Sequence, residues 1–187
     1  MTVKDIIETS AVFLGREDII SYLKGDDISL SNEDAETEIS ILVRCVNIVL
    51  NELATEFVPL KTTETVRCNN GQILYSSLLQ SPLEILKVFD INGKELDFSL
   101  NQLFIKTNSN AVQVEYTYIP LPLNLSSTCV YAENEVPARI VAYGVAEKAC
   151  LFEGKFDEAE IWAKKFKESA STISLPKNAV IKGRRWR

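Results

Sequence analysis

The sequence predicts an α+β fold: a helical bundle made from N- and C-terminal helices, with an inserted small antiparallel β-sheet and an extended basic C-terminal tail. Apolar residues recur at helical spacing before residue 58 and after residue 137, whereas strand-like alternation falls in residues 61–119. Five of the 20 basic residues lie in the last twelve positions, with no acidic residue among them. Helices and strands are not interleaved, so a doubly wound α/β fold is not expected.

The length of 187 residues suits one domain with an extension. We expect a single domain over residues 1–175, followed by a basic tail over residues 176–187. Within the domain the expected order is N-terminal helices, inserted sheet, long loop and C-terminal helix pair, over residues 1–58, 61–119, 120–136 and 137–171.

The N-terminal region predicts three helices. The first covers residues 3–13 and ends at Gly15, and the second ends at Gly25. Ser31 is a plausible N-cap for a long third helix over residues 32–57, with acidic residues in its first turn. Its apolar residues repeat at spacings of three and four: Ile39, Leu42, Val46, Val49 and Leu53.

Further apolar residues fill much of the remaining circumference of this long helix. Such a helix must be covered on more than one side. Two interpretations stay open: a central core helix, or a core helix whose second face contacts another subunit. This stretch alone slightly favours the first.

Beyond Pro59 the pattern changes to alternating runs typical of strands. Asn92-Gly93 between two such runs is a strong hairpin signal. The run AVQVEYTYI places Val112, Val114, Tyr116 and Tyr118 on one face. We therefore expect one small antiparallel sheet of four to six strands.

The C-terminal region predicts two helices in tandem. Pro137 suits a first helical turn, and Gly154 separates the two helices. The first is rich in small apolar residues that permit close helix approach. The second places five apolar residues on one face: Ala159, Trp162, Ala163, Phe166 and Ala170.

The composition argues against several classes of chemistry. The chain has no histidine, which removes the commonest general base and metal ligand, and its seven glycines form no phosphate-binding loop. We predict no catalytic residue, no cofactor and no metal site, and hence no enzyme. The four well-separated cysteines favour a reducing compartment, with a disulfide as the less favoured alternative. No apolar run is long enough for a membrane span, and the N-terminus does not resemble a signal peptide.

The basic tail contrasts with an acidic body. The chain carries a net charge of −6, but residues 1–175 hold 15 basic and 26 acidic residues, a net charge of −11. Arginine and tryptophan are enriched at interface hot spots, so a partner-binding tail is favoured over a terminus without function. An acidic body favours a protein partner over nucleic acid. The candidate partner-binding residues are Lys182, Arg184, Arg185, Trp186 and Arg187.

Three stretches together resemble a known family of proteins. They are RCVNIVLNELATEFVPLKTTETV, VAYGVAEKACLFEGKFDEAEIWAKKFKESAS and the terminal KGRRWR. In this order, with a sheet inserted between the helices, the arrangement is similar to that of head-to-tail adaptor proteins (connector or neck proteins) of tailed bacteriophages. The resemblance is one of arrangement and covers nearly the whole chain.

The resemblance implies a structural virion protein, made in the host cytoplasm and located in the neck between capsid and tail. Identical subunits form a ring, typically of twelve, beneath the portal vertex. The C-terminal tail docks on the portal protein, and the sheet region faces a tail or nozzle protein. The ring passes genomic DNA without sequence-specific binding. The helices build the subunit contacts, for which the candidates are Ile39, Val46, Leu53, Trp162 and Phe166.

Two alternatives to this interpretation remain. One is a non-viral soluble adaptor that binds an acidic protein partner through its basic tail. The other, less favoured, is an enzyme that uses carboxylates, which would need acidic residues converging in a deep pocket.

Overall fold

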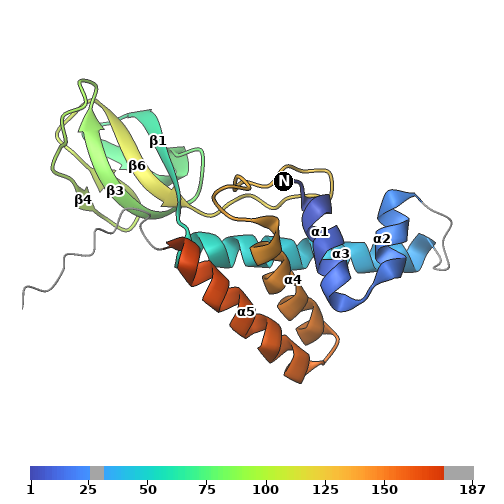
Figure 1. Cartoon of the computed structure of the whole chain (residues 1–187). Coiled ribbons are helices and arrows are strands. Elements are labelled where there is room, and N and C mark those ends of the chain that lie inside the picture. The colour runs from blue at the N-terminus through green and yellow to red at the C-terminus, as the bar shows by residue number, and fades with distance from the viewer. Residues whose placement is uncertain (26–31, 175–187) are drawn as a thin grey trace, which may run out of the picture. The chain divides into compact units, whose positions relative to one another are not determined.

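The chain divides into two compact units, each described here by itself (Figure 1). The computed structural model describes residues 1–25 and 32–174. The helical unit contains residues up to Leu50 and from Pro122 onward, and the β unit contains residues 51–121. The stretch 1–175, expected as a single domain, thus comprises two units. Both Ser31 and the basic tail lie outside the described residues.

The helical unit is built by helices from both ends of the chain, as the sequence predicts. Contacts join α1 to α4 and α4 to α5, so residues far apart in sequence share one core (Figure 1). The α+β fold class is therefore confirmed. The helices are α1 (Val3–Leu14), α2 (Glu17–Lys24), α3 (Asn32–Glu52), α4 (Ala138–Phe152) and α5 (Phe156–Ser174).

Local signals define the ends of these helices. A capping box begins α1: the Thr2 N–H donates to the Asp5 carboxylate at 2.7 Å, and the Asp5 N–H donates to the Thr2 hydroxyl at 3.2 Å. Gly15 and Gly25 end α1 and α2 in the left-handed conformation expected of a C-terminal cap. Pro137 is the N-cap of α4, one residue before the helix begins.

The small residues of α4 allow the close packing that the sequence predicts. A Cβ atom added to Gly144 would lie 2.8 Å from Val49 Cγ1 on α3 and 3.2 Å from Phe166 Cδ2 on α5. Gly144 therefore lies where α3, α4 and α5 pack closely together, and all three of these residues are buried. A larger side chain at this position would push the helices apart.

The predicted long helix extends to residue 57, but its last turn differs from the rest. Residues Leu53–Phe57 form a π-helical turn that follows α3 directly, and the Val58 N–H donates to the Leu53 carbonyl at 2.7 Å. Strand β1 begins at Leu60, after the expected stop at Pro59.

The β unit contains two three-stranded antiparallel sheets, so the expected single sheet of four to six strands is wrong. One sheet has the order β1–β6–β3 and the other β2–β5–β4. Strand β6 pairs along its whole length with β1, which leaves β5, its neighbour in sequence, to join the second sheet. The strands are β1 (Leu60–Arg67), β2 (Gln72–Leu74), β3 (Pro82–Asp90), β4 (Ser99–Leu100), β5 (Phe104–Lys106) and β6 (Ala111–Tyr118).

The predicted face of β6 forms much of the core of this unit. Val112, Val114 and Tyr116 are fully buried, and Tyr118 packs against the same cluster. The turn at Asn92-Gly93 is also present, closed by a hydrogen bond of 2.8 Å from the Asp90 N–H to the Lys94 carbonyl. Its return arm joins β3 through one isolated bridge, Phe89 to Glu95, and a hydrogen bond of 2.8 Å from the Leu96 N–H to the Val88 carbonyl, whereas the extended pairing of β3 is with β6.

Candidate interaction surfaces

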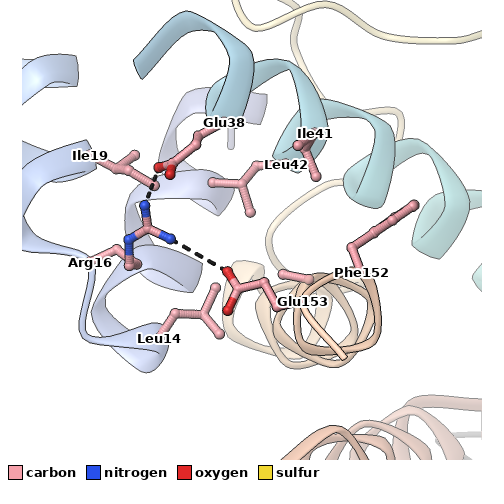
Figure 2. A pocket seen from close by; sticks show the side chains of 9 residues that line it. Leu14, Arg16, Ile19, Glu38, Ile41, Leu42, Phe152 and Glu153 are labelled. Atoms are coloured by element: carbon pink, nitrogen blue, oxygen red, sulfur yellow. Dashed lines mark hydrogen bonds and ion pairs between the residues drawn. The ribbon is translucent and has the colours of Figure 1, made fainter. Parts of the chain in front are cut away.

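A groove of about 180 Å³ lies in the helical unit where the corner between α1 and α2 meets α3 and the C-terminal end of α4 (Figure 2). We call it the acidic groove. Ile41 and Phe152 are its exposed apolar residues, with 63% of Phe152 accessible to solvent. Its remaining apolar lining comes from Leu14, Ile19, Leu42 and Ala149.

One guanidinium crosses this groove and joins three helices. The left-handed turn at Gly15 positions Arg16, whose N–H donates to the Ala11 carbonyl at 2.9 Å. The Arg16 side chain donates to Glu38 of α3 and, at 3.4 Å, to Glu153 at the end of α4 (Figure 2). Asp18 of α2 accepts two further bonds of 3.4 Å.

The charges in the groove do not balance. The carboxylate of Glu38 raises the pKa of Arg16 above its ordinary value, although partial burial acts in the opposite direction. Arg16 is therefore charged at any physiological pH. Lys155 contacts the second oxygen of Glu153 at 2.7 Å. The lining itself holds two carboxylates, Glu38 and Glu153, and one cation, Arg16, so the groove is net acidic.

Three half-buried aromatic rings from α1, α4 and α5 form a second surface of the helical unit. Phe13 stacks on Tyr143 and Trp162 with ring centroids 5.1 and 5.3 Å apart. The Lys165 ammonium lies 4.3 Å from the Trp162 ring centroid, and the Arg139 guanidinium 5.5 Å from that of Tyr143. We call these five residues the aromatic face.

The acidic groove and the aromatic face both include residues of α4. Tyr143 and Phe152 are nine residues apart on this helix, which is two and a half turns. The side chains of these two residues consequently point in opposite directions from the helix axis. The helical unit therefore presents two surfaces of unlike chemistry.

The structure buries most of the predicted subunit-contact residues inside the chain itself. Ile39, Val46, Leu53 and Phe166 are each less than 9% exposed. This placement leaves these four side chains no surface to offer a second subunit. Trp162 alone of the five is partly accessible, as a member of the aromatic face. The large exposed apolar residues of the same helices are Ile41, Ile48, Phe156 and Ile161.

Sequence reasoning did not select Phe13, Arg16, Tyr143 or Phe152 as candidate residues. Each is a single residue without a motif around it, and only the packing of four helices brings them into surfaces. The one local signal was Arg16, a cation directly after a helix-ending glycine. The predicted tail residues Lys182, Arg184, Arg185, Trp186 and Arg187 lie outside the described residues.

The β unit carries a third surface, made of exposed leucines in two neighbouring segments, 74–83 and 100–103. A hydrogen bond of 3.2 Å joins the Tyr75 N–H to the Leu103 carbonyl, and Tyr75, Leu83 and Leu100 line one pocket. The most exposed residue is Leu79, at 84%. We call this the leucine surface; its members are Leu74, Leu79, Leu83, Leu100 and Leu103.

The described residues hold no group of three or more metal-ligating side chains. The four cysteines are described and free, and burial raises the pKa of the Cys45 thiol to about 11. None of the described helices combines the length and apolar character needed to cross a lipid bilayer.

Comparisons with known proteins do not assign a family. No protein-family model and no curated protein matches this sequence.

Proposed function

We propose that this chain is a ring-forming head-to-tail adaptor of a tailed bacteriophage, a structural protein between portal and tail. The observation that carries the proposal is the pair of unlike surfaces on the helical unit, whose α4 residues Phe152 and Tyr143 point in opposite directions. Contact between two unlike surfaces is head-to-tail, and repeating it generates a closed ring or an open filament. A ring subunit needs such a pair of surfaces, whereas a monomer does not.

The other surfaces supply the remaining contacts of an adaptor. The leucine surface of the β unit would bind the tail or nozzle protein, because a cluster of exposed leucines is typical of an interface. The basic tail, Lys182–Arg187, would bind the portal protein, pairing arginines with carboxylates and placing Trp186 in a pocket. The adaptor would thus bind its neighbours, the portal and the tail through separate parts of the chain.

The acidic body suits a channel for DNA. Residues 1–175 carry a net charge of −11, and a wall that repels phosphates does not retain the genome as it passes. A continuous basic lumen in the assembled ring would contradict this part of the proposal.

Electron microscopy and a mass measurement of the assembled full-length chain test the proposal. We expect closed rings of the 21.0 kDa subunit in electron micrographs, with a ring mass from mass photometry that gives a whole number of copies near twelve. A gene for a portal or major capsid protein beside this gene would add support. A monomer that binds one cellular protein would instead favour the non-viral adaptor.

The docking role of the tail has its own test. A chain lacking residues 182–187 should keep its helical circular dichroism spectrum and its ring mass, because these residues follow the last described helix. It should no longer bind the portal protein in a pull-down assay. The matched control replaces Lys24 and Lys94, two cations of the body, with alanine and should bind normally. Normal portal binding by the truncated chain would contradict the docking role.

A further inference from the structure

The two surfaces of the helical unit are complementary in charge. Arg139 and Lys165 of the aromatic face make no ion pair with any residue that the structure describes, although each lies over an aromatic ring. The acidic groove has the opposite imbalance, with two carboxylates and one cation in its lining. Unpaired cations on one surface and a net negative charge on the other favour contact between them.

The same surfaces are also complementary in their apolar parts. Exposed aliphatic residues flank the aromatic face: Val12 precedes Phe13, and Ile161 lies one helical turn before Lys165. Across the unit, Phe152 and Ile41 expose apolar surface around a concave groove. Large exposed apolar side chains in a ring of charges are typical of an interface with an apolar centre and a polar rim.

The geometry decides how the two surfaces can meet. Tyr143 of the aromatic face and Phe152 of the acidic groove point to opposite sides of α4, so these two residues of one copy cannot contact each other. Resting on the proposed ring-forming function, we propose that the aromatic face of each subunit docks into the acidic groove of the next subunit. Lys165 and Arg139 then lie against Glu153 and Glu38, and an apolar side chain of the aromatic face covers Phe152.

A charge exchange tests this contact. Lys165→Glu and Glu153→Lys should each weaken self-association about tenfold, measured by sedimentation velocity over a range of concentrations. The double variant should recover most of the loss, because it restores opposite charges at every interface. Surface ion pairs of this exposure contribute under about 1 kcal/mol to folding, so each variant should remain folded.

Matched controls keep the charge changes but move them off the proposed contact. The controls are Lys167→Glu, two residues from Lys165 on α5, and Glu36→Lys, two residues from Glu38 on α3. Both wild-type side chains are exposed and point about 200° around the helix from Lys165 and Glu38 respectively. They should leave self-association within about twofold of the wild type. Equal weakening by controls and test variants would overturn the proposal.

Photocrosslinking locates the contact without relying on a charge. A benzoylphenylalanine at Phe152, which is 63% exposed, should crosslink to α1, α4 or α5 residues around the aromatic face of a different copy. Mixed isotope-labelled and unlabelled chains identify crosslinks between copies by mass spectrometry. Crosslinks from groove to groove, or to the β unit, would overturn the proposal, as would a chain that stays monomeric at every concentration.

These outcomes separate the contact from the function. If closed rings form equally well with the charge variants and the crosslinks lie at other residues, the proposed contact is wrong. The proposed adaptor function is not contradicted by that result. Open filaments with the expected crosslinks would support the contact and count against a ring adaptor.

Discussion

Arg16 shows how one residue can hold several helices in register. Its planar guanidinium presents donors in more than one direction, so it can bind Glu38 of α3 and Glu153 of α4 at the same time. A lysine at this position has a single point of positive charge and would satisfy one carboxylate well. These ion pairs fix the helices around the groove and leave the groove with a net negative charge. The proposed subunit contact requires this negative charge.

A larger residue at position 144 should crowd the contact between α4 and α3. Gly144→Ala places a methyl group 2.8 Å and 2.9 Å from the two methyl carbons of Val49, closer than side chains pack without moving. We expect a loss of about 1–3 kcal/mol in the free energy of unfolding, the usual cost of overfilling a packed core. Urea denaturation followed by circular dichroism measures it.

A second substitution distinguishes crowding from a general effect of the new side chain. In the double variant Gly144→Ala with Val49→Ala, the valine methyl groups that obstruct the new Cβ are gone. The double variant should lose clearly less stability than the sum of the two single losses, because the sites are in contact. Simple additivity would show that the close approach of α3 and α4 is not the cause.

The candidate residues show where sequence reasoning stops at this scale. The spacing of Ile39, Val46 and Phe166 correctly identified apolar helix faces, and those faces are buried in the chain's own core. Periodicity reports that a face must be covered but not by which element. The aromatic face could not be predicted, because Phe13 and Tyr143 become neighbours only when α1 packs on α4.

At the scale of elements, helix ends were predictable and strand pairing was not. Gly15, Gly25 and Pro137 act through their own backbone preferences, so the sequence alone locates the boundaries. Pairing in a sheet depends on distant partners. Asn92-Gly93 correctly predicted a turn, yet the extended pairing of β3 is with the distant β6, and the segment after the turn forms only an isolated bridge with β3.

Hydrogen bonds of Tyr116, on strand β6, fix the segment that carries Leu79 of the leucine surface. The Tyr116 hydroxyl donates to Glu64 of β1 at 2.9 Å and accepts from the Gln80 N–H at 3.3 Å. Glu64 also accepts from the Leu79 N–H at 3.0 Å. Tyr116→Phe should cost about 1–2 kcal/mol and speed amide hydrogen exchange at Leu79 and Gln80, because it removes one partner of a partly buried network.

Tyr118→Phe is the matched control for this prediction. Tyr118 lies two residues along the same strand, and its hydroxyl makes no hydrogen bond with the residues that the structure describes. Its loss should change stability by less than about 0.5 kcal/mol and leave exchange at residues 79 and 80 unaltered. Equal effects of the two substitutions would show that the network does not hold this segment.

At the scale of the whole molecule, the two units carry different surfaces. The acidic groove and the aromatic face belong to the helical unit, and the leucine surface belongs to the β unit. If the proposed roles are right, charge changes in the helical unit should alter self-association alone. Leu79→Ser with Leu103→Ser should keep the ring mass but lose binding to the tail-side protein. An effect of the leucine substitutions on ring mass would contradict this division.

The charge distribution of the whole chain leads to a prediction about DNA. All of the net positive charge lies in residues 176–187, and the remainder carries −11. A chain ending at residue 175 should therefore not shift duplex DNA in an electrophoretic assay at ordinary ionic strength. The full chain should bind DNA weakly at most, with log K falling against log salt with a slope no steeper than about −4.5, the limit for five cations. The two chains are compared on duplexes of different sequence, and neither should discriminate between them. Comparable DNA binding by the shortened chain would mean that a basic surface exists on the body, and a wall that attracts the genome would argue against a channel that releases it.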